Sequence, residues 1–144
     1  MSLLKDLADA LAAGLSAHSW ASVSAQPTVS RLNWPSIDIE DMASPVIVVT
    51  PGGDTVERVN REKHQHDYGL NVFVGRHTPT EASADQMLEL AEEVVDVILA
   101  HSWGELQFPA TSPQAIAIEI NPDEALQDRN AWRAVISVTY RTHR

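Results

Sequence analysis

The sequence predicts an α+β fold: a mostly antiparallel sheet with one long helix and an N-terminal helix packed against it. Three observations predict it: a helical pattern opens the chain, a longer one lies past its middle, and strand-like segments stand on both sides of the longer one. Strands and helices do not alternate as in a parallel α/β sheet, and no internal repeat is present. A length of 144 residues fits a single domain, residues 1–144.

The first helical pattern has apolar residues at three- and four-residue spacing from Leu3 to Leu15. It predicts an amphipathic helix that ends near Gly14 and that covers the core or packs on a neighbouring subunit. A strand is expected next, between Pro27 and Trp34. The acidic residues 38–41 then predict a solvated loop.

The most β-branched segment of the chain lies between Pro45 and Pro51. It predicts a strand that is buried on both faces at the centre of the sheet, and the glycines of residues 52–54 predict a turn directly after it. The alternation of polar and apolar residues over 67–74 predicts the next strand. Together these segments predict a long hairpin arm with its tip near residues 63–65.

The longer helix is predicted to begin at the capping sequence of residues 78–81 and to run to about His101, with one apolar stripe facing the core. A short strand is expected over residues 116–120, followed by a turn at residues 121–123. The last strand is expected to place alternate residues of 132–140 on one face.

The charge of the chain is strongly acidic and unevenly distributed. Twenty Asp and Glu against ten Lys and Arg give a formal net charge of -10, which repels nucleic-acid backbones and anionic membranes. No Lys or Arg lies between Arg76 and Arg129, a stretch that holds eleven acids. Specific DNA recognition is therefore not expected, and the base-free stretch is the feature that a function has to explain.

The longer helix lies inside this base-free stretch and carries like charges four residues apart. Each such pair is unfavourable by about 0.2 to 0.5 kcal/mol. The acidic face is solvated, lines a shared channel, or meets arginines of another subunit. The pairs are Asp85 with Glu89, Glu89 with Glu93, and Glu92 with Asp96.

No catalytic motif is present, so the sequence does not predict an enzyme and predicts no cofactor. The chain has no cysteine, which excludes disulfides, thiolate metal sites and a thiol nucleophile. The glycine-rich residues 51–54 lack the lysine and the following helix of a phosphate-binding loop. The N-terminus contains an acid by Asp6 and no long apolar run follows, so no signal peptide or membrane span is expected.

An alternative hypothesis is a small metal-binding module or enzyme built on His64, His66 and Asp67. Two imidazoles two residues apart on a strand project to the same face and can bind one metal ion. The remaining histidines show no paired spacing, and the helical carboxylates have no histidine three residues away. A third metal ligand is therefore not evident, and no metal site is predicted.

Four segments in this order resemble the tail-terminator and related tail-completion or neck proteins of tailed bacteriophages over nearly the whole chain. They are residues 46–51, residues 67–74, the acidic helix of residues 87–99, and residues 132–141, which end in Val138-Thr139-Tyr140-Arg141. The resemblance implies a structural virion protein that forms a hexameric ring. Such a ring caps the tail tube, stops its polymerisation and joins the tail to the head connector.

The partners that the resemblance implies are further copies of the chain, the tail tube protein and the head–tail connector proteins. Genomic DNA passes through the central channel without specific binding, which suits an acidic lumen. The protein is expected to be encoded by a phage or prophage, made in the bacterial host cytoplasm, and located in the tail or neck of the virion. No membrane is involved.

The charge distribution suggests how such a ring is held together. Acids of one subunit, Glu89 and Glu93, are expected to meet the bases of the next. The polar arm of residues 55–75 reaches a neighbour or the tail tube, or is a mobile surface hairpin. A monomeric or dimeric binding domain remains the competing hypothesis. The candidate bases are Arg58, Arg61, Lys63 and Arg133.

Overall fold

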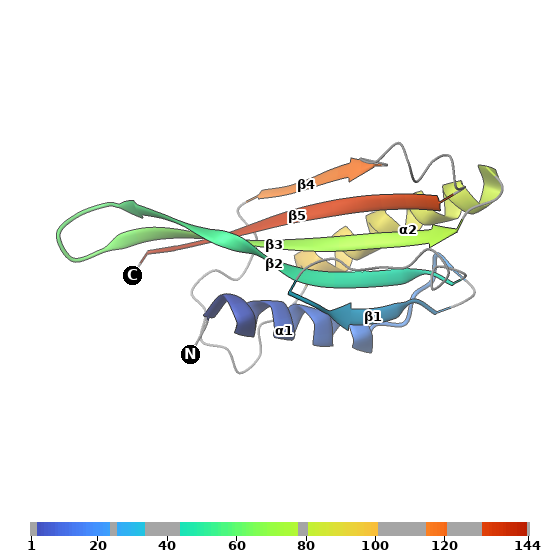
Figure 1. Cartoon of the computed structure of the whole chain (residues 1–144), viewed down its shortest axis with the longest axis horizontal. Helices are drawn as coiled ribbons and strands as arrows, with labels where there is room; N and C mark the ends of the chain where they lie inside the picture. Colours follow the sequence, from blue (N-terminus) through green and yellow to red (C-terminus); the bar gives the residue numbers. More distant parts are fainter. Residues whose placement is uncertain are drawn as a thin grey trace.

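A computed structural model describes residues 3–23, 26–33, 44–77, 81–100, 115–120 and 131–143. Within these residues the predicted α+β class is confirmed: two helices lie on a sheet with the strand order β1-β2-β3-β5-β4 (Figure 1). Among the strands of these residues, only β1 and β2 pair in parallel. The elements in chain order are α1 (Leu3–Ala17), β1 (Thr28–Arg31), β2 (Val46–Arg58), β3 (His64–His77), α2 (Glu81–Ala100), β4 (Ala115–Ile120) and β5 (Ala131–His143).

The long hairpin arm is confirmed and is built by the central strand. β3 pairs with β2 from Val46↔Gly75 to Arg58↔His64, and with β5 as far as Gln65↔His143. Figure 1 shows the end of the β2–β3 hairpin extending well beyond the helices. The arm is therefore a continuation of the sheet, stiffened along most of its length by β5.

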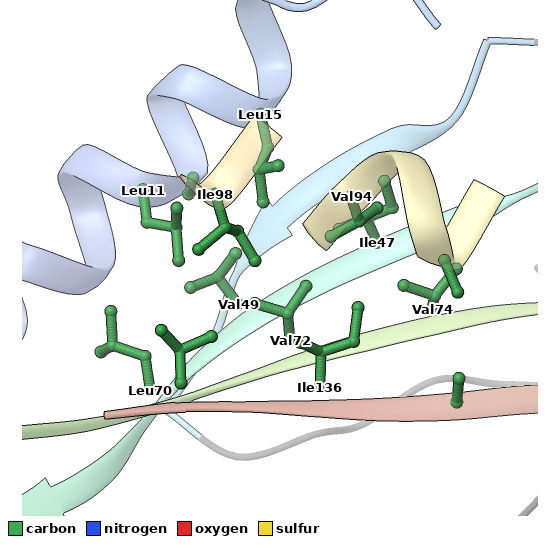
Figure 2. Close-up of a cluster of buried hydrophobic side chains, with 14 of the residues drawn as sticks. Leu11, Leu15, Ile47, Val49, Leu70, Val72, Val74, Val94, Ile98 and Ile136 are labelled. Carbon is green, nitrogen blue, oxygen red and sulfur yellow. The ribbon is translucent and has the colours of Figure 1, made fainter. Parts of the chain in front are cut away.

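The core lies between the two helices and one face of the sheet. Alternate residues of β3 and β5 face the helices, as the alternation predicts, and the apolar stripes of α1 and α2 pack on them (Figure 2). On β2 four consecutive residues are buried, which confirms the strand buried on both faces. These four residues are Ile47, Val48, Val49 and Thr50. An ion pair of 3.1 Å between Asp9 and Arg31 also links α1 to β1.

The predicted turn at residues 52–54 is wrong, because β2 continues through it. The register shifts by one residue between Pro51 and Gly53, which is a β-bulge opposite Gly69. Gly53 has a φ of 127°, a conformation that suits glycine, and a Cβ on Gly52 would lie 3.0 Å from the carbonyl oxygen of Gly69. The glycines thus let the two strands of the arm bend and approach closely instead of reversing the chain.

The tip of the arm lies at residues 59–63, slightly earlier than the predicted residues 63–65. The N–H groups of Val59 and Asn60 donate to the carbonyl of Lys63 at 3.2 Å. The Asn60 side chain accepts from the N–H groups of Glu62 and Lys63 at 2.9 and 2.8 Å. The side chain of Asn60 therefore stabilises the chain reversal at the tip, whereas the sequence predicted a turn at residues 52–54. The predicted features at residues 38–41, 78–80 and 121–123 lie outside the described residues.

The bulge generates a stability prediction. Gly53→Ala leaves the new methyl group in open space, so its cost comes from the backbone conformation alone. We expect it to lower the free energy of unfolding by about 1 to 3 kcal/mol, measured by denaturant titration. The matched control is Gly69→Ala, whose methyl group makes ordinary contacts of 3.7 Å. Equal effects of the two substitutions would show that the bulge imposes no conformational demand.

Candidate assembly interface

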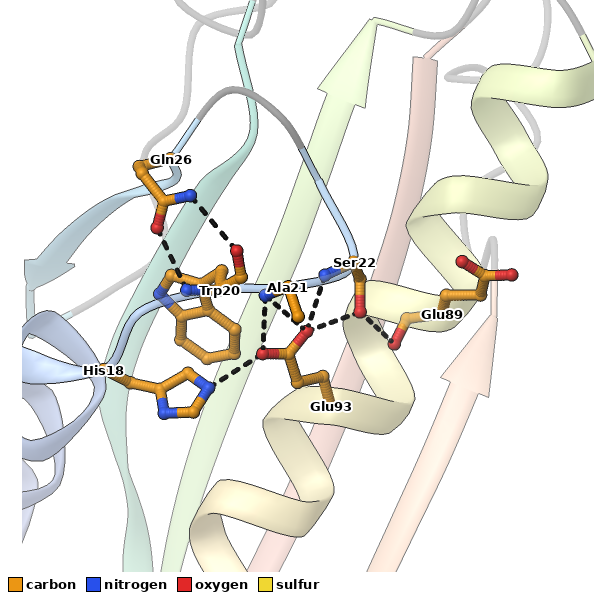
Figure 3. Close-up of polar contacts among 7 residues, drawn as sticks. All are labelled: His18, Trp20, Ala21, Ser22, Gln26, Glu89 and Glu93. Carbon is orange, nitrogen blue, oxygen red and sulfur yellow. Dashed lines mark hydrogen bonds and ion pairs between the residues drawn. The ribbon is translucent and has the colours of Figure 1, made fainter.

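The carboxylate of Glu93 on α2 lies at the centre of a hydrogen-bond network that the sequence did not reveal. It accepts from the backbone N–H groups of Ala21 and Ser22 at 3.1 and 2.9 Å, and also from the Ser22 hydroxyl. Nε2 of His18 lies 2.7 Å from the same carboxylate (Figure 3). Residues 18–22, which follow α1, are thereby fastened to the middle of α2.

The segment that binds Glu93 is held in shape by its own contacts. Trp20 and Gln26 exchange two hydrogen bonds of 3.0 and 3.1 Å between backbone and side-chain amide groups. The Trp20 side chain is buried, and the His18 ring packs edge-on against it with the centroids 4.6 Å apart. The donors therefore face Glu93 in a fixed arrangement, as Figure 3 shows.

This arrangement lowers the pKa of Glu93. Burial of the carboxyl group acts to raise the pKa, but the hydrogen bonds from Ser22, His18 and the backbone of residues 21–22 outweigh it. The resulting pKa is about 2, against the ordinary value of 4.5. The charge of Glu93 is thus stabilised within the chain, and the side chain is only 16% exposed.

The predicted interface acids consequently differ in their surroundings. Glu89 is exposed to solvent one turn before Glu93. Asp85, Glu92 and Asp96 are exposed as well. These four side chains form the acidic face of α2, and Glu93 lies on the flank that faces the segment after α1. The predicted role of Glu89 at an interface stays a prediction.

Three of the predicted interface bases gather at the tip of the arm. Arg58, Arg61 and Lys63 are exposed there, and Nε of Arg58 donates to the carbonyl of Asn60 at 3.3 Å. Figure 1 shows the tip pointing away from α2 of the same chain. The acids and bases that the sequence pairs therefore do not meet within one chain, and a contact between them requires a second copy.

Arg133 lies apart from this group of bases. It pairs with Gly75 at the opposite end of β5, on the face of the sheet that carries no helix in the described residues. Its guanidinium carbon lies 4.6 Å from the centre of the Phe73 ring, a cation–π contact. The structure does not place Arg133 with the bases of the arm.

The residues of the alternative metal site are divided between the two faces of β3. His64 and His66 share one face, whereas Asp67 projects to the other and accepts two hydrogen bonds from Arg141 at 2.8 and 3.2 Å. Nδ1 of His66 lies 3.1 Å from Asp54, and its ring stacks on Tyr68. Among the described residues, no group of three or more His, Cys, Asp or Glu side chains is placed to hold a metal ion.

A shallow hollow of about 400 Å³ lies beside the bulge at the base of the arm. Its two carboxylates, Asp54 and Asp67, are those already paired with His66 and Arg141. The hollow therefore offers no free charged group from Asp or Glu. Its lining is Gly52, Gly53, Asp54, Thr55, Asp67, Gly69 and Thr139. In the part of the chain that the structure describes, neither helix has the length and apolar character needed to cross a membrane.

The chain resembles known proteins in fold and not in sequence. No protein-family model matches the chain, and no curated protein matches it in sequence. A chain in the solved structure of the virion of a native gene transfer agent (GTA) particle has a similar fold, with a TM-score of 0.62 and 14% sequence identity. The match covers 96% of this chain and 95% of that one, so the two folds correspond over nearly their whole length.

The Glu93 network generates a pH-dependent prediction. Glu93→Gln is expected to lower the free energy of unfolding at pH 7 by about 2 to 3 kcal/mol, because it removes a charged acceptor of several hydrogen bonds. The contribution of this carboxylate is fully present above the ordinary pKa of 4.5 and is lost as the pH falls through about 2. The difference between the two proteins should therefore shrink below pH 4.5, as measured by urea titration at a series of pH values.

Glu89→Gln is the matched control, since it lies on the same helix with an exposed side chain. Its effect should stay below about 0.5 kcal/mol, as for a surface substitution. A Glu93→Gln effect no larger than this would contradict the structural role of the network.

Proposed function

We propose that this protein is a structural component of a phage-like virion particle and acts without catalysis. The observation that carries the proposal is the fold shared, over 96% of the chain, with a chain of a gene transfer agent virion particle. Fold similarity alone does not define function, so the proposal also depends on the surfaces of this chain. Within the particle we assign the protein the role of a tail terminator, and the whole chain forms one domain for that role.

In this role the protein forms a hexameric ring that caps the tail tube and joins it to the head–tail connector. Two surfaces of opposite charge support ring formation: the acidic face of α2 and the basic tip of the arm. Because they lie apart on one chain, their contact joins copies head to tail, which is the arrangement that generates rings. The net charge of -10 supports passage of DNA through the ring without binding.

The ring assignment is tested by measuring mass and activity on tubes. We expect native mass spectrometry to find an assembly of six times the 15.8 kDa of one chain, alone or on tail tubes. Added to polymerising tail tube protein, the chain should limit tube length in electron micrographs. A chain that stays monomeric and leaves tube length unchanged would contradict the terminator role. A stoichiometric transition metal in the purified protein would instead favour the metal-binding alternative.

The acidic face is tested by charge reversal at Glu89 and Glu92, which are both exposed. Glu93 is left intact, because its reversal would break the network that holds residues 18–22. With about 1 kcal/mol lost per reversed exposed pair, the double Lys variant should raise the dissociation constant for assembly about tenfold or more. Its circular dichroism should match that of the unaltered protein. Unchanged assembly at low salt would sink the assignment of the acidic face to an interface.

A further inference from the structure

Two exposed isoleucines lie at the β4 edge of the sheet on the same face as the helices. Ile118 and Ile120 pair with Ile136 and Ala134 of β5, which point into the core, and so project to that face. They are nevertheless 41% and 46% exposed. The reason is that β4 is the edge strand, and α2 packs mainly against β5 and β3.

Two exposed leucines of α2 lie on the flank that is turned toward β4. Leu88 and Leu99 are eleven residues apart, which is three helical turns, and are 36% and 54% exposed. Glu93 occupies the other flank, where it binds the segment after α1. Since α1 packs on β1 and β2, at the opposite end of the strand order, the leucine flank points to the β4 side.

These four side chains, Leu88, Leu99, Ile118 and Ile120, constitute the β4-side apolar surface. The acidic face of α2 borders it, because Glu92 and Asp96 follow Leu88 and Val95 around the helix. α2 carries six acids and no base along its length. A partner for this surface therefore needs apolar side chains next to positive charge.

The tip of the arm has this chemistry. Val56 and Val59 are 53% and 55% exposed, although no core requires them at the end of a polar hairpin. Arg58, Arg61 and Lys63 stand within a few residues of them, against two acids, Glu57 and Glu62, in residues 56–63. The arm beyond the bulge is about 20 Å long at 3.3 Å per residue, similar to the six-residue strand β4.

We propose that the arm tip of one copy docks on the β4-side apolar surface of a second copy. Val56 and Val59 cover the isoleucines and leucines, and the bases of the tip meet the acidic face of α2. Opposite charges steer the encounter and fix the orientation, while the apolar contact supplies binding energy. The inference rests on the proposed ring, for which it names the two surfaces that adjoining subunits share.

The absence of cysteine makes the contact directly measurable by crosslinking. A Val59→Cys chain is mixed with an Ile118→Cys chain and treated with a short bismaleimide, and heterodimers are quantified by mass spectrometry. The control partner carries Ser137→Cys, which is exposed on the other face of the sheet, opposite Asn71. We expect several-fold more heterodimer with Ile118→Cys than with Ser137→Cys.

Adding Arg58→Glu and Arg61→Glu to the Val59→Cys chain should bring the yield down to that of the control. Equal yields for the two partners would overturn the docking proposal. If rings of the unaltered chain still form on tail tubes, the proposed function stands and its subunits meet elsewhere. If instead Ile118→Cys is preferred but tube length is unchanged, the docking contact is supported and the terminator assignment fails.

Discussion

The structure depends on the complete pairing of β3 with a neighbour on each side. This central strand is bonded to β2 and β5 from the body of the sheet, where Val72 and Val74 enter the core, out to His64 and Gln65 in the arm. Because the same ladder holds both regions, the arm has a direction fixed by the sheet. A hairpin of two strands alone is marginal in water, and the third strand supplied by β5 is what allows the arm to project.

Two local features depart from regular strand pairing and from an apolar core. The glycine bulge at Gly53 bends the arm where it leaves the core, and Glu93 places a charge inside the contact between α2 and the segment after α1. Each exception departs from a sequence rule: glycines in a strand usually weaken it, and a helical acid usually belongs to solvent. Each has a specific partner in the structure. Gly69 lies opposite the bulge in the ladder, and the donors of residues 18–22 bind the carboxylate of Glu93.

Periodicity and composition were sufficient to predict the order of the helices and strands in the described residues, because the helices, β3 and β5 each bury one regular face. Periodicity was insufficient where the same residue type is found in two kinds of structure. Gly52 and Gly53 have the composition of a turn but form a bulge, and the choice depends on Gly69 across the ladder. The Glu93 network joins residues more than 70 positions apart, and neither His18 nor Ser22 stands in a recognisable motif. The strand order, in which β5 lies between β3 and β4, likewise has no signal in the local pattern of the sequence.

The Glu93 network also affects the repulsion between the like charges of α2. Among the like-charge pairs of α2, the structure shows a compensating partner for Glu89 with Glu93, since N–H and O–H donors stabilise the charge of the second carboxylate. Glu92 and Asp96 remain exposed neighbours, and no ion pair within the described residues offsets their repulsion of about 0.2 to 0.5 kcal/mol. These exposed acids make no contact within the described residues that stabilises the fold, whereas Glu93 fastens residues 18–22 to α2. The structure thus separates Glu93, which holds the fold together, from the exposed acids, which are free of such a role and carry the proposed contact between copies.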